Sequence, residues 1–130
     1  MICDDDSGIR NCIKRLILIV SNSNRIAIDL TESINGIDCL HKIYKDYING
    51  INYDALLIDE NMPFMKGSSC IRILKNMYSE GHLNKFRMMS ISSNDDNDTY
   101  NLLKANGCEE FLPKPHTKEI ISKFLNSLII

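Results

Sequence analysis

Two classes of function are excluded by what the sequence lacks. No apolar run approaches the roughly 20 residues that cross a bilayer as a helix, so we expect no membrane contact by this chain. Basic residues are not in excess, because 15 Lys and Arg face 17 Asp and Glu and leave a net charge of −2. A nucleic-acid-binding domain would carry a basic stripe. The sequence therefore predicts neither a membrane-embedded nor a nucleic-acid-binding domain.

Paired cysteines are also missing. The chain has five cysteines, an odd number, and none of them forms a CxxC pair: Cys3, Cys12, Cys39, Cys70 and Cys108. Scattered cysteines of this kind are typical of small apolar core residues. We expect neither a disulfide framework nor a zinc site.

The beginning of the chain carries no targeting signal. The first residues, MICDDDSG, lack the basic and apolar regions of a secretion signal, so we expect a cytoplasmic location. A length of 130 residues, with 44% hydrophobic and 25% charged residues, predicts one globular domain over residues 1–130. Only three residues precede Asp4, so we expect a short or truncated first strand, as in a domain cut from a longer chain.

Helical and strand-like patterns alternate along the chain. Apolar residues at helical spacing predict five helices, over about residues 7–20, 37–47, 68–78, 98–107 and 117–129. Ser7 is placed to cap the first helix, and Gly107 ends the fourth. Short apolar runs predict five strands, at residues 1–3, 25–30, 55–58, 87–92 and 109–112. The alternation predicts an α/β fold with a parallel sheet covered by helices on both faces.

Polar residues follow the predicted strands. Asp4, Asp5 and Asp6 follow the first strand, Asp59 the third, Ser92 and Ser93 the fourth, and Lys114 the fifth. Ligands of such folds bind at the carboxyl ends of the strands. Crowded carboxylates repel one another unless a cation lies among them, and a hard cation with oxygen ligands, most simply Mg²⁺, meets that need. A lysine and a hydroxyl on the other side would suit a phosphoryl group.

Each of these residues also has a plainer interpretation. The stretch DDDSG is compatible with a solvated turn and a helix cap, and Asp59 with a turn residue. Ser92 is compatible with a core serine bonded to backbone, and Lys114 with a loop position between two prolines. Their joint occurrence at successive strand ends favours a site.

The same residues resemble the response-regulator receiver domain over nearly the whole chain. That family has an acidic pair after strand one, an aspartate followed by xxMPxMxG after strand three, Thr or Ser after strand four, and Lys-Pro after strand five. Here these are Asp4-Asp5, Asp59 with ENMPFMKG, Ser92 in SISSN, and Lys114-Pro115. The resemblance implies a three-layer, doubly wound (βα)5 fold of the flavodoxin-like kind, with strand order 2-1-3-4-5.

The resemblance also implies a function in two-component or phosphorelay signalling. Asp59 would accept a phosphoryl group from a phosphohistidine on a histidine kinase or a histidine phosphotransfer protein. Mg²⁺ would be held by Asp4, Asp5, Asp59 and the backbone carbonyl of Asn61. Such a domain catalyses only its own phosphorylation and dephosphorylation.

Further roles are expected for residues near these strand ends. Lys114 and Ser92 would hold phosphoryl oxygens, and Ser92 and the aromatic Phe111 would form a switch that alters the partner-binding face. Asn61 and Asn94 would flank the path of a hydrolytic water. Asp6 has no assigned metal role and is expected to be solvated or to cap a helix. Pro113 would lie within the last strand, which suits an edge.

Other functions fit less well. A P-loop NTPase would need a GxxxxGK stretch, which the sequence lacks. An aspartyl-phosphate hydrolase of the haloacid-dehalogenase type would need an acid two residues after its nucleophile, where this chain has Asn61. A receiver-like module that binds partners without accepting phosphate stays open. So does the choice between a free-standing carrier and the receiver of a hybrid sensor kinase, of which we favour the latter.

Overall fold

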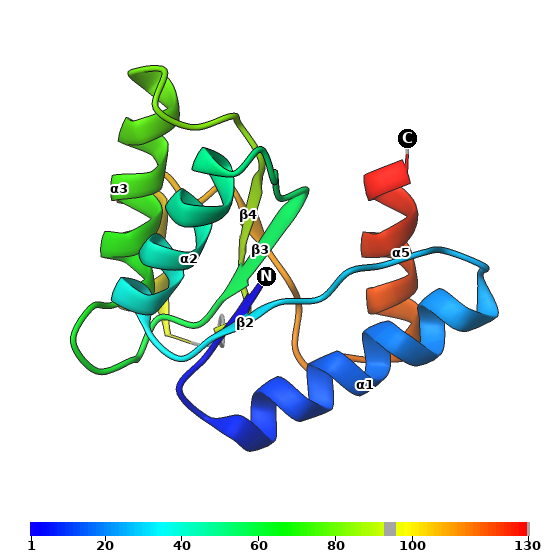
Figure 1. The fold of residues 1–130 in the computed structure, drawn as a ribbon. Coiled ribbons are helices and arrows are strands. Elements are labelled where there is room, and N and C mark those ends of the chain that lie inside the picture. Colours follow the sequence, from blue (N-terminus) through cyan, green and yellow to red (C-terminus); the bar gives the residue numbers. More distant parts are fainter. Residues whose placement is uncertain (93–95, 130) are drawn as a thin grey trace.

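A computed structural model describes residues 1–92 and 96–129 of the chain. Five strands alternate with five helices (Figure 1). The strands are β1 (Ile2–Cys3), β2 (Glu32–Ser33), β3 (Ala55–Ile58), β4 (Arg87–Ser90) and β5 (Glu110–Phe111). The helices are α1 (Ser7–Ser23), α2 (Gly36–Ile48), α3 (Gly67–Ser79), α4 (Asn97–Ala105) and α5 (Lys118–Ile129). No helix in the described part of the chain is long and apolar enough to cross a bilayer.

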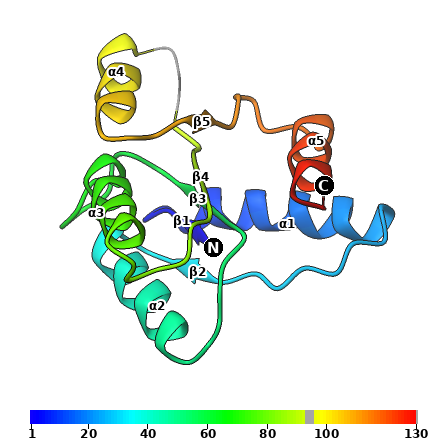
Figure 2. The same ribbon diagram turned by 90° about the horizontal axis from the view of Figure 1, so that it is seen from above.

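The five strands form one parallel sheet in the order β2-β1-β3-β4-β5, which confirms the predicted fold class. Helices α1 and α5 pack together on one face, and α2 and α3 pack on the other (Figures 1 and 2). Helix α4 continues the α3 side beside β5 (Figure 2). Because neighbouring strands run in the same direction, all five end at the same edge of the sheet.

Each face of the sheet has its own apolar core. Alternate residues of the strands point to opposite faces, so Leu56 and Ile58 join the core under α2 and α3, whereas Leu57 joins the core under α1 and α5. Cys3, Cys39, Cys70 and Cys108 are buried, as predicted. Cys12 is not, because it lies on the exposed side of α1.

The structure corrects the prediction of a strand at residues 25–30. These residues lie outside the sheet, and β2 begins only at Glu32. The alternation that suggested a strand is present, because Ile26, Ile28 and Leu30 are half-buried against the α1–α5 core while Ala27 and Asp29 are exposed. The segment lacks a neighbouring strand, because β1 pairs only from Ile2 onward.

Two smaller expectations also change. Asp6, and not Ser7, caps α1, because its carboxylate accepts hydrogen bonds from the amides of Gly8 and Ile9 at 2.8 and 3.3 Å. Strand β5 ends at Phe111, so Pro113 lies beyond the strand and not within it. The predicted residues Ser93 and Asn94 lie outside the described residues.

Candidate functional site

Three carboxylates meet where β1 and β3 end. The two strands are neighbours, with Cys3 opposite Ile58, so Asp4 and Asp59 follow them side by side. The amide of Asp59 donates to the carbonyl oxygen of Cys3 at 3.0 Å, which fixes this register. Asp4, Asp5 and Asp59 each place a carboxylate oxygen within 4.8 Å of the other two. The sheet topology therefore assembles the predicted acidic cluster.

The cluster carries concentrated negative charge in a partly dry environment. The side chain of Asp4 is buried, Asp59 is half-buried and Asp5 is exposed. Burial, with the charges of Asp59 and Asp5, raises the pKa of Asp4 to about 6, although a hydrogen bond from the amide of Asp6 opposes the shift. Among the described residues no Lys or Arg forms an ion pair with these three carboxylates. Uncompensated oxygen ligands of this kind fit a hard divalent cation.

Ser92 belongs to the same site. It follows β4, the next strand in the sheet, and its hydroxyl donates to a carboxylate oxygen of Asp59 at 2.8 Å. The same hydroxyl accepts a hydrogen bond from the amide of Glu60 at 2.7 Å. Ser92 therefore touches both the side chain and the following backbone of the predicted phosphoryl acceptor.

Glu60 is a residue of the site that the sequence did not reveal. Its side chain is buried beside the start of α3, where it accepts hydrogen bonds from the amide of Ser68 at 2.6 Å and from the Ser68 hydroxyl at 2.8 Å. The N-cap residue of α3, Lys66, gives no side-chain hydrogen bond to the helix. Glu60 therefore supplies the acceptor for a free amide in the first turn of α3. The interaction ties the residue after Asp59 to the helix, and an acidic residue in a loop gives no sequence signal of it.

The loop between Asp59 and α3 is held close to the strand. The amide of Gly67 donates to the carbonyl of Glu60 at 3.1 Å. A β-carbon at Gly67 would overlap the carbonyl oxygen of Asp59, so only glycine fits here. Met62 of the same loop is buried in the core beneath α2 and α3, and the sulfhydryl of Cys3 lies 3.6 Å from its sulfur.

The other predicted site residues form no hydrogen bond with the side chain of Asp59 in the described part of the chain. Lys114 is exposed after β5 and forms no hydrogen bond or ion pair with Asp59 among the described residues. Asn61 is exposed in the loop after Asp59. Phe111 is half-buried at the end of β5, and its ring lies 4.7 Å from that of Tyr100 on α4, centroid to centroid. The structure thus brings Asp4, Asp5, Asp59 and Ser92 together, and Lys114 makes no polar contact with Asp59 in the described part of the chain.

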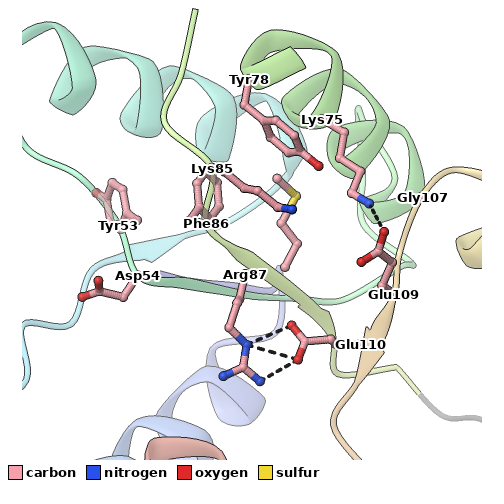
Figure 3. Close-up of a pocket in the computed structure, with 11 residues that line it drawn as sticks. Tyr53, Asp54, Lys75, Tyr78, Lys85, Phe86, Arg87, Gly107, Glu109 and Glu110 are labelled. Carbon is pink, nitrogen blue, oxygen red and sulfur yellow. Dashed lines mark hydrogen bonds and ion pairs between the residues drawn. The ribbon is translucent and has the colours of Figure 1, made fainter. Parts of the chain in front are cut away.

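A hollow lies at the other end of the sheet from the acidic cluster, beside the start of β4 (Figure 3). Its cations face acids: Lys75 is 2.9 Å from Glu109, and Arg87 forms hydrogen bonds with Glu110 at 3.0 and 3.1 Å. These pairs neutralise most of its charge, so the acidic cluster, and not this hollow, is the candidate functional site.

Comparisons with known proteins agree with the geometry. The signal receiver domain of the putative response regulator NarL from Mycobacterium tuberculosis superposes with a TM-score of 0.74 at 25% identity, over 98% of this chain and 93% of that one. The receiver domain of a signal transduction histidine kinase from Syntrophus aciditrophicus gives a TM-score of 0.76 at 16% identity, over 98% and 86% of the two chains.

Sequence comparison gives a more limited match. "Hybrid signal transduction histidine kinase M" of Dictyostelium discoideum is 26% identical over 78 residues, which are 60% of this chain and 3% of that protein. No protein-family model matches the chain. The sheet order, the acidic strand ends and the structural neighbours together show that this chain has the fold of a response-regulator receiver domain.

Proposed function

We propose that the chain is a phosphoryl-accepting receiver domain of a two-component or phosphorelay system, with Asp59 as the acceptor. One observation carries the proposal: the carboxylates of Asp4 and Asp5 and the hydroxyl of Ser92 gather around Asp59 at the ends of three neighbouring strands. A structural role alone would not need an uncompensated buried Asp4 beside two further acids.

The donor set fits Mg²⁺. Asp4, Asp5, Asp59 and the backbone carbonyl of Asn61 would hold the ion, all with the oxygen ligands that it prefers. A bound Mg²⁺ would supply positive charge against the oxygens of the incoming phosphoryl group. Burial is the main cause of the raised pKa of Asp4, and the ion would relieve the repulsion from Asp59 and Asp5 that adds to it.

The residues of the chain support a displacement at phosphorus. A carboxylate oxygen of Asp59 attacks the phosphorus of a phosphohistidine, an O–P bond forms, the P–N bond breaks, and its electron pair returns to the imidazole. Ser92, already at hydrogen-bond distance from Asp59, then donates to a phosphoryl oxygen. Lys114, exposed and unpaired with Asp59, swings in to contact another oxygen.

Phe111 is suited to report the phosphorylation state. It is the last residue of β5, the strand beside β4, and Ser90, two residues before Ser92, lies opposite it in the sheet. Movement of Ser92 toward a phosphoryl group would open space near this strand, and the ring of Phe111, stacked on Tyr100, would respond to it. The surface around α4 and β5 would then differ between two states.

The partners that follow from this chemistry are a histidine kinase or a histidine phosphotransfer protein. Similarity to a segment of a hybrid histidine kinase supports a place inside such a signalling chain. We propose no nucleic-acid partner for this domain, because its net charge of −2 leaves no excess of basic residues.

The proposal is tested by exposing the chain to acetyl phosphate with and without Mg²⁺ and measuring the intact mass. We expect one Mg²⁺-dependent phosphate, absent from Asp59→Asn. A folded chain that gains none would instead be a receiver-like module that binds partners without phosphate.

A further inference from the structure

Helix α2 carries a second, largely apolar stripe besides the side that packs against α3 and β2. This α2 stripe consists of four exposed residues, Ile37, His41, Tyr44 and Ile48. Ile37 keeps 52% and Ile48 keeps 68% of its surface exposed. At about 100° per residue, the four positions lie within about 60° of one another around the helix axis. They therefore form one line along the helix and are not scattered exposed residues.

The α2 stripe lies on an outer side of the molecule. Figure 2 shows α2 at the β2 end of the sheet, far from α4. The buried residues of the helix, among them Cys39 and Ile43, belong to the core under α2 and α3 and lie on a different side of the helix. The stripe is exposed along its whole length, so in the described part of the chain no other element covers it.

The spacing within the α2 stripe is that of a seam between two helices. From Ile37 to Ile48 the stripe advances in steps of four, three and four residues, which is the a and d spacing of a heptad repeat. Side chains at this spacing pack by inserting between the side chains of a second helix. The stripe therefore fits a helix as its partner.

The charges beside the α2 stripe favour a second copy of the same helix. Asp38 lies in the first turn of α2 and Lys45 in the last turn, and both lie on the same side of the stripe. Lys45 forms no ion pair with another residue of the described chain. When two copies of α2 pair antiparallel, the acidic end of each helix meets the basic end of the other. A parallel pair would instead place like charges together.

The antiparallel arrangement also matches the side chains of the stripe. When Ile37 of one copy lies against Ile48 of the other, His41 of one copy lies against Tyr44 of the other. Apolar residues then fill both ends of the seam. An imidazole beside a tyrosine hydroxyl near the two-fold axis can form a hydrogen bond, and a polar pair at a seam position fixes the register.

Helix α1 shows why exposed apolar residues alone do not predict this contact. Ile9 and Ile19 are also exposed, on α1. The residues Ser7–Ser23 contain three cations and no acidic residue, however. Two copies paired along α1 would bring these like charges together, which is unfavourable. The charges therefore distinguish α2 from α1 as a surface for self-association.

We propose that the chain forms a two-fold symmetric dimer through antiparallel α2 helices, with the α2 stripe as the seam. The same surface of both copies makes the contact, so the assembly closes at two copies. Each copy contributes mainly one helix, which makes a small interface, so the dimer is weak and depends on concentration.

Sedimentation of the whole chain from about 10 µM to about 1 mM tests the association. We expect a monomer–dimer equilibrium whose dissociation constant rises at least about tenfold in Ile48→Lys. Lys45→Glu should raise it about threefold or more, because it places two acids together. Ile19→Lys, at an exposed apolar residue of α1, is the matched control and should leave the equilibrium unchanged. Thermal unfolding checks that each variant is folded.

Cross-linking tests the orientation of the two helices. In a Cys12→Ser background, which removes the exposed cysteine, Ile37→Cys and Ile48→Cys chains are mixed in a glutathione redox buffer. The antiparallel register predicts a disulfide between the two different variants. It predicts none between two Ile37→Cys chains, because their positions would lie roughly 16 Å apart along the seam, beyond the reach of a disulfide.

Three results would overturn the proposal. The first is a chain that stays monomeric at every concentration, which would leave the α2 stripe to a helix of another protein. The second is equal weakening of the dimer by Ile48→Lys and Ile19→Lys, or by neither. The third is cross-linking of Ile37→Cys chains with each other, which would show a parallel pair. None of these readouts involves phosphate, so the outcome is independent of the role of Asp59.

Discussion

The hydroxyl of Ser92 joins the side chain of Asp59 to the backbone that follows it. It donates to Asp59 at 2.8 Å and accepts from the amide of Glu60 at 2.7 Å. One hydroxyl thus satisfies a buried amide and orients the proposed acceptor. A phosphoryl group on Asp59, as we propose, would compete with the carboxylate for this donor.

Replacing Ser92 therefore has two separable effects. Ser92→Ala leaves the Glu60 amide without a partner, and we expect it to lower the free energy of unfolding by about 1–3 kcal/mol. It should also slow phosphorylation of Asp59. Ser92→Thr keeps the hydroxyl and serves as the control, measured by urea unfolding and by the rate of phosphate addition. Equal stability of the Ala and Thr variants would contradict the assigned hydrogen bond.

Glu60 should matter for stability more than its place in a loop suggests. Glu60→Ala removes both acceptors of Ser68 at the start of α3, and we expect a loss of at least about 2 kcal/mol in unfolding free energy. Glu60→Gln keeps one acceptor oxygen and should lose less. Glu80→Ala, on the exposed end of the same helix, is the matched control and should be near neutral. A loss no larger than that of the control would show that Glu60 does not hold α3.

Gly67 sets the distance between α3 and the backbone of Asp59. Gly67→Ala introduces a β-carbon that overlaps the Asp59 carbonyl, so we expect a destabilisation of about 1–3 kcal/mol or more and slower phosphorylation. Gly50→Ala is the comparison, because a β-carbon there meets no atom within 4 Å although its φ of +80° is unfavourable. Thermal unfolding compares the two. If only Gly50→Ala destabilised, close packing at Gly67 would be refuted.

The buried amine of Met1 predicts a pH dependence of stability. Burial lowers its pKa below the ordinary 8.0, so the unfolded chain holds a proton that the native chain releases. The cost of burying the charged amine is largest below its lowered native pKa, where the amine is protonated in both states. Stability should therefore rise as the pH increases toward and through 8.0. The N-acetylated chain lacks this titrating group. The difference in urea midpoint between the acetylated and the unacetylated chain should therefore shrink as the pH rises toward and through 8.0. A constant difference would contradict burial of the charge.

Much of the fold was predictable because its signals are local. Helical spacing located all five helices, and the short apolar runs located four of the five strands. The strand predicted at 25–30 was wrong because alternation reports which side chains are buried, and Ile26 and Ile28 are half-buried without any strand pairing. Pairing depends on a neighbour, which the local sequence does not contain.

The site was predictable to the extent that it follows from strand ends. Asp4, Asp59 and Ser92 meet because parallel neighbouring strands end at one edge. The role of Glu60 depends on a contact with Ser68, which no spacing rule predicts. The position of Lys114 depends on the loop after β5, where its side chain is exposed, and its proposed contact with a phosphoryl group stays a prediction.

The most direct test of the central claim is phosphoryl transfer from a P–N donor. The chain is incubated with phosphoramidate, whose P–N bond matches that of phosphohistidine, with Mg²⁺ or with a chelator, and the phosphate is located by peptide mass mapping. We predict one phosphate on Asp59, dependent on Mg²⁺ and absent from Asp59→Asn. Phosphate on another residue, or none on a chain that remains folded, would contradict the assignment of Asp59 as the acceptor.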